Sequence, residues 1–168
     1  MLIKMVIIDA LIVWVHLICS SIWVGGSIFL GIVLAPEIKN LKQNIEDRLS
    51  LMIRFGRKFN RIALPSFLIL MVTGIYNSRS FILHPNEIIE TQYGQILIIK
   101  IIVAVAILII YFIHIRIFST KSEEDITSGK FDLQYLISVR TRIIWLGRIT
   151  VFLSIIVLML ASLLDSGI

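Results

Sequence analysis

Four long apolar stretches limit what this chain can fold into. They cover about residues 6–34, 62–82, 94–118 and 143–164. A helix needs about 20 mostly apolar residues to cross the hydrocarbon core of a bilayer. In lipid, an open sheet would leave backbone groups unpaired, whereas a helix pairs them within one segment. The sequence therefore predicts an all-α integral membrane protein, a four-helix bundle in which residues 1–168 form one domain.

Composition supports this class and excludes others. Of the 168 residues, 58% are hydrophobic and only 16% are charged, whereas soluble domains have about a quarter of their residues charged. The first stretch is longer than the core of a signal peptide, and we expect it to be retained. A single cysteine, Cys19, excludes an internal disulfide and a metal site built from several cysteines.

The basic residues predict the orientation and the partners. Most lie in residues 35–61 and 116–142, between apolar stretches. We expect the protein in the plasma membrane. Cytoplasmic loops carry an excess of Lys and Arg, so both basic segments are expected in the cytoplasm and both termini outside. The net charge of +5 then suits anionic lipid headgroups of the bilayer, and no nucleic acid is expected as a partner.

The segment between the first two spans shows an amphipathic pattern. In residues 37–59, apolar side chains recur at helical spacing among charged ones. This pattern predicts an amphipathic helix lying in the inner interface, although a helix that docks on a partner protein would look the same. Pro65, in the first turn of the second span, is expected at a helix start.

One histidine lies within the first apolar stretch and raises the question of its partner. An ionisable group at membrane depth costs at least ~2.5 kcal/mol, so His16 is expected to face the protein interior. The first and third helices of an alternating bundle run in the same direction, and His16 and Lys100 lie within about one helical turn of the same depth. The pair is therefore the candidate set of metal or haem ligands, in the outer half of the bilayer.

Several other residues are placed to support such a site. Asp9 and Trp23 lie seven residues before and after His16, on one stripe of the helix. The supporting candidates are Asp9, Cys19, Trp23, Gly25, Gly26, Thr73, Asn77 and Gln95. Cys19, three residues after His16, could share a copper site because thiolate and imidazole both suit copper. Gly25 and Gly26 would leave room for a flat ring such as haem b.

A purely structural interpretation stays open for these residues. Lys100 could extend its amine to the headgroups, and His16 could bond a hydroxyl or carbonyl of a neighbouring helix. An inner polar set, His114 and Arg148, also fits a structural role. His114 is roughly 20 Å from His16 along the helix axis, too far to share one metal.

Short motifs resemble a known family. The segments His16 with Trp23-Val24-Gly25-Gly26, Leu34-Ala35-Pro36, Thr73-Gly74 and Tyr93-Gly94-Gln95 through Lys100 resemble the copper-resistance D (CopD) membrane domain over about residues 10–118. There is weaker similarity to HemJ-type protoporphyrinogen oxidases, in which a first-helix histidine and a third-helix lysine are the proposed haem ligands. By position these correspond to His16 and Lys100.

Three hypotheses follow. The CopD resemblance implies a membrane protein that handles or transports copper, with His16 as central ligand and Lys100 gating nearby. The alternative is a haem b-binding subunit of a membrane redox complex, of which a HemJ-like oxidoreductase would be the enzymatic form. The third is an accessory subunit whose polar groups only hold helices together. A four-helix chain of this kind is expected to form a homo-oligomer or to join a larger membrane complex.

Overall fold

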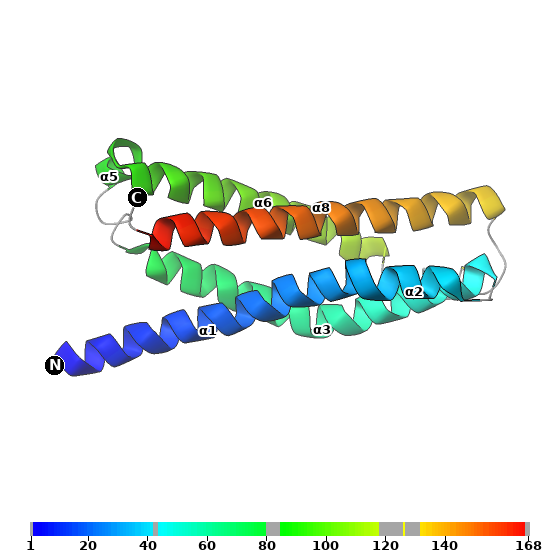
Figure 1. The fold of residues 1–168 in the computed structure, drawn as a ribbon, viewed down its shortest axis with the longest axis horizontal. Helices are drawn as coiled ribbons and strands as arrows, with labels where there is room; N and C mark the ends of the chain where they lie inside the picture. Colours follow the sequence, from blue (N-terminus) through cyan, green and yellow to red (C-terminus); the bar gives the residue numbers. More distant parts are fainter. Residues whose placement is uncertain (1, 42–43, 80–84, 118–125, 127–131, 167–168) are drawn as a thin grey trace.

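The computed structural model describes residues 2–41, 44–79, 85–117, 126 and 132–166, and the regular elements there are all helices (Figure 1). Helix α1 (Leu2–Ile28) continues through the π-helical segment η1 (Phe29–Leu34) into α2 (Ala35–Asn40). The other elements are α3 (Ile45–Asn77), the short α5 (Pro85–Glu90), α6 (Gln92–Ile117) and α8 (Leu133–Asp165). Among the described residues, four helices are long and apolar enough to cross a membrane, which confirms the all-α membrane fold.

The long helices pack mainly as two neighbouring pairs. Helix α1 packs along α3, and α6 packs along α8, while α1 also touches α8. The N-terminus, the C-terminus and α5 lie at one end of the bundle, which we call the terminal end (Figure 1). Helix α2 and the beginning of α8 lie at the opposite end. We call this the basic end, because it brings together the described parts of the two basic segments expected from the sequence.

The π-helical segment has a local cause in the sequence. Pro36 has no backbone N–H, and its ring would clash with the carbonyl of Ile32 in a regular α-helix. In η1 the chain is wound more widely, and the N–H of Ala35 bonds the carbonyl of Leu30, five residues back. The helix therefore passes Pro36 without ending, but it is wider at this point.

Helix α3 differs from the sequence prediction. Residues 37–59 were expected to form one separate interfacial helix. Residues 37–40 instead belong to α2, and residues 45–59 are the first half of one continuous helix that ends at Asn77, not at residue 82. Pro65 lies inside this helix and not at its start. The described part of the chain shows no separate interfacial helix. The reason is that a protein surface, and not lipid, covers the apolar face of residues 45–59.

That surface is a second hydrophobic core at the basic end. Leu49 and Ile53 of α3 are completely buried, together with Leu136 and Ile143 of α8. At 1.5 Å per residue, the 33 residues of α3 span about 50 Å, whereas the hydrocarbon core is about 30 Å thick. Helices α3 and α8 therefore extend beyond the hydrocarbon at the basic end, and the second core holds these extensions together.

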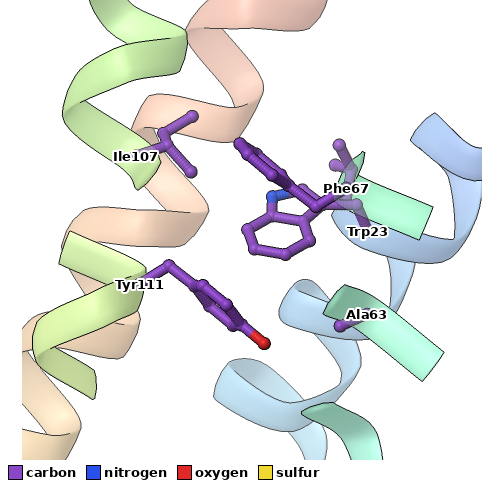
Figure 2. Packing of buried hydrophobic residues seen from close by; sticks show 6 residues of the cluster. Trp23, Ala63, Phe67, Ile107 and Tyr111 are labelled. Carbon is purple, nitrogen blue, oxygen red and sulfur yellow. The ribbon is translucent and has the colours of Figure 1, made fainter. Parts of the chain in front are cut away.

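The main core brings together buried side chains of α1, α3 and α6, as Figure 2 shows. The ring centroid of Trp23 lies 4.6 Å from that of Phe67 and 5.2 Å from that of Tyr111. Val24 of α1, Ala63 of α3 and Ile107 of α6 complete the buried cluster. Aromatic rings at these distances and tilted angles attract one another beyond the area that they bury. This cluster therefore joins α1, α3 and α6.

Candidate functional site

The partner of His16 is the side chain of Thr73. The Nδ1 atom of His16 lies 2.7 Å from Oγ1 of Thr73, joining α1 to α3. The Thr73 hydroxyl in turn donates to the carbonyl oxygen of Ile69 at 2.7 Å. Because its only proton is used in that bond, the Thr73 oxygen accepts from Nδ1–H of His16. The neutral ring then carries its lone pair on Nε2, the form in which imidazole binds metals.

A glycine beside Thr73 gives the His16 ring its position. A Cβ placed on Gly74 would lie 3.7 Å from Cε1 of His16, in ordinary contact. A larger side chain there would occupy the space of the ring. The Thr73-Gly74 pair therefore both hydrogen-bonds the ring and leaves room for it against α3.

Lys100, the second candidate ligand, lies on α6. It is half-buried, and its ammonium group is within electrostatic range of the His16 ring. The structure shows no hydrogen bond from Lys100 to the residues it describes. Its amine is therefore not held by another described side chain and can interact with a ligand bound at His16.

Asp9 has a structural partner at the terminal end. Its carboxylate accepts a 2.8 Å hydrogen bond from the Tyr76 hydroxyl and pairs with the Arg79 guanidinium at 3.0 Å. Arg79 also lies over the Tyr76 ring, 4.3 Å from the centroid. Side chains of Asp9 and Arg79 remain about half exposed, at 40% and 46%. This group ties the start of α1 to the end of α3 and does not reach His16.

The remaining supporting candidates are dispersed. Asn77 is exposed, and Gln95 donates through Nε2 to the carbonyl oxygen of Ile89 at 3.0 Å. Cys19 is buried with a free thiol. Trp23 is in the main core, where its Nε1 has no hydrogen-bond partner among the described residues. The structure therefore joins His16 to Thr73 and leaves the other polar candidates in separate surroundings.

The two glycines do not form the expected space for a flat ring. A Cβ on Gly26 would overlap the ring of Phe59, so the space beside Gly26 is filled by that side chain. No atom of the described part of the chain lies within 4 Å of a Cβ position at Gly25, which is exposed on the outside of α1. These positions do not fit haem. Among the described residues, no group of three or more His, Cys, Asp or Glu side chains is placed to hold a metal ion either.

The inner polar set lies at the basic end around a cavity of about 310 Å³. His114 bonds the backbone of Ile143, and a Cβ on Gly147 would lie 4.0 Å from its Cε1. His114 therefore lies against a glycine of the neighbouring helix, as His16 does. Arg148 lines the same cavity and is exposed, 5.8 Å from the centroid of Trp145. The sequence analysis did not predict this cavity, although the basic residues and Pro36 were signals present in the sequence.

These features define a class, a small four-spanning membrane protein with a histidine anchored to a neighbouring helix and a cavity at its basic end. The family comparison narrows it. The sequence model of the family "Copper resistance protein D" matches residues 53–164, which is more than half of the chain, and the protein belongs to this CopD family. The match includes Thr73, Gly74, Lys100 and the whole fourth span up to Leu164, which the sequence resemblance had not used. It does not include the helix that carries His16.

Curated proteins and solved structures add little on function. An uncharacterized protein of Aquifex aeolicus (strain VF5) is 29% identical over 75 residues, which cover 44% of this chain and 50% of that protein. The match thus spans about half the length of that relative. No solved structure matches the chain.

Proposed function

We propose that this protein handles copper at the membrane, with His16 as the central ligand of a transient copper site. Membership of the CopD family supports copper as the substrate. The observation that carries the site is the 2.7 Å contact between Nδ1 of His16 and Thr73. Ligating histidines characteristically donate their second ring nitrogen to a fixed acceptor, which orients the ring and increases its basicity.

The surroundings of His16 favour weak and reversible copper binding. Imidazole binds both copper oxidation states, and the Cys19 thiol, three residues along the same helix, is the nearest soft ligand in sequence. The Lys100 ammonium repels a cation at His16, because like charges in a low-dielectric region interact strongly. We therefore assign Lys100 the role of a gate that limits how long copper stays at His16.

The location and assembly of the protein are part of the proposal. The shared position of the described basic residues supports a plasma-membrane protein with its basic end in the cytoplasm and both termini outside. One imidazole is a sparse ligand set for copper, so a second copy of the chain, or another subunit of a membrane complex, would complete the coordination.

Haem b is the second candidate occupant, and one observation favours it. Two nitrogen donors, from α1 and α6, lie within electrostatic range of each other in apolar surroundings, and haem takes such axial ligands. A redox subunit, or an enzyme resembling HemJ, would use His16 and Lys100 in this way. The Phe59 ring, however, fills the space beside Gly26 that a haem would need, and this favours copper.

An absorption spectrum and a copper titration of the purified protein test the proposal. We expect no Soret band, and saturable binding of Cu(I) that is lost in His16→Ala. The matched control is His114→Ala, which removes the imidazole at the basic end and should keep copper binding. A Soret band that disappears in His16→Ala would instead establish haem. Equal copper binding by wild type and His16→Ala would refute His16 as the ligand.

A further inference from the structure

The cavity at the basic end is an elongated slot parallel to the helices. Helix α3 lines it from Arg48 to Asn60, a rise of about 18 Å along the helix. Helix α8 lines it from Arg140 to Thr150, and the α1–η1 segment from Trp23 to Leu34. Lining residues recur every three or four positions on each helix, so one face of each turns toward the slot. The slot therefore runs from the basic end toward the main core.

The two ends of this slot differ in chemistry. Lys39, Arg48 and Arg140 line the end near the loops, and no Asp or Glu is among the described lining residues. Toward the middle the lining is formed mainly by apolar and aromatic side chains, including Leu30, Phe59 and Tyr111. A molecule that fits this slot carries negative charge at one end and an apolar body at the other.

Two polar groups strengthen the case for a bound molecule. Tyr111 is 6% exposed, and its buried hydroxyl has no hydrogen-bond partner in the described structure. In Figure 2 this hydroxyl is at the free end of the ring, directed away from Ile107 and toward the side of Ala63. Arg140 is half-buried and makes no ion pair with the described residues. Burying such groups without partners costs free energy, and a ligand that brings acceptor oxygens to Arg140 would recover part of it.

We propose that this slot is a binding site for one anionic phospholipid of the leaflet at the basic end. The phosphate lies among Lys39, Arg48 and Arg140, and one acyl chain extends along the slot toward Phe59 and Tyr111. Lipids stand in the membrane with this orientation, and basic pockets between spanning helices on the cytoplasmic side suit anionic headgroups. The volume of about 310 Å³ is at the lower limit of ligand pockets, about 300–1,000 Å³. It accommodates part of a lipid.

The site is separate from the proposed copper ligand. The aromatic core of Trp23, Phe67 and Tyr111 lies between the slot and the level of His16. Four cationic side chains line the slot, the three named above and Arg148, so a bare copper ion is repelled there. A failure of copper binding at His16 would therefore leave the lipid proposal unaffected, and the reverse also holds.

Retention of lipid by the full chain tests the proposal. The protein is reconstituted in nanodiscs of phosphatidylcholine with 10% or so phosphatidylglycerol, extracted in mild detergent, and analysed by native mass spectrometry. We expect one retained phosphatidylglycerol per chain. Arg140→Gln removes a charge-assisted contact to phosphate, and about ten-fold weaker retention is expected, which equals about 1.4 kcal/mol.

Arg142→Gln is the matched control. Arg142 lies two residues further along α8, loses the same charge when substituted, and lines a different surface groove with Arg116 and Trp145. Its retention of lipid should equal that of the wild type. Ile144→Trp fills the slot without changing the charge, and it should reduce retention as much as Arg140→Gln. Thermal melting in phosphatidylcholine alone confirms that each variant is folded.

Three results would overturn the proposal. Equal losses in Arg140→Gln and Arg142→Gln would show that lipid is attracted only by the general positive charge. Undiminished retention in Ile144→Trp would show that no acyl chain enters the slot. Inorganic phosphate that displaces phosphatidylglycerol at equal concentration would show a site for a free anion and not for a lipid.

Discussion

Adjacent glycines on α1 provide a sharp test of the packing between α1 and α3. Alanine is better than glycine in a helix by about 1 kcal/mol, and this gain applies equally to Gly25→Ala and Gly26→Ala. At Gly25 the added methyl group meets no atom within 4 Å, so the gain should appear in full. At Gly26 the methyl group overlaps the Phe59 ring. Inserting a methyl group into a packed site costs about 1–3 kcal/mol.

The structure indicates that the packing cost of Gly26→Ala is in the lower part of the range of about 1–3 kcal/mol. Phe59 borders the slot at the basic end, so its ring has space into which it can turn. We therefore expect Gly26→Ala to be less stable than Gly25→Ala by about 1–2 kcal/mol. The difference isolates packing, because the helix-propensity gain is common to both variants.

Reversible unfolding in mixed micelles, followed by circular dichroism, measures this difference. The variant Phe59→Leu shortens the side chain that Gly26 contacts, and in that background the cost of Gly26→Ala should disappear. A double-mutant cycle then gives the coupling between the two positions. Free energies of unfolding of Gly25→Ala and Gly26→Ala that agree within about 0.5 kcal/mol would refute the close approach of α1 to α3.

Three further predictions follow from single contacts. Thr73→Val keeps the shape of the side chain but removes the acceptor for Nδ1–H of His16. Copper affinity should therefore fall about 10–100-fold in a Cu(I) competition titration, whereas Thr73→Ser should retain it. An unchanged affinity in Thr73→Val would refute the positioning role. Tyr111→Phe removes a buried hydroxyl with no partner in the described structure, so delipidated protein should melt at the same or a higher temperature, and a clear decrease would reveal a partner. Asp9→Asn breaks an exposed ion pair with Arg79, so it should cost only about 0.2–1 kcal/mol, less at high salt; a loss that is independent of salt would contradict this.

Part of the candidate site was predictable because helical periodicity determines which residues share a face. Asp9, His16 and Trp23 were expected on one stripe, and each does contact a side chain of α3: Tyr76, Thr73 and Phe67 respectively. A hydroxyl partner for His16 was among the alternatives that the sequence left open. Lys100 was expected near His16, and the two groups are in electrostatic range.

Other features required the packed structure. The face of residues 45–59 was recognised as apolar, but periodicity cannot say whether lipid or protein covers it. Here Leu136 and Ile143 of α8 cover it. Likewise, two neighbouring glycines look equivalent in a sequence, yet one contacts Phe59 and the other faces outward.

By itself, the sequence determined four apolar spans, the clustering of basic residues between them, and the stripe that contains His16. These follow from composition and from a 3.6-residue period, which are local properties of the chain. Only the tertiary structure decided that Thr73 meets His16, that Phe59 fills the space at Gly26, and that a slot lies between Tyr111 and the basic end. Each of these depends on how far one helix is shifted along another, and that shift is set by the combined packing of side chains from several helices.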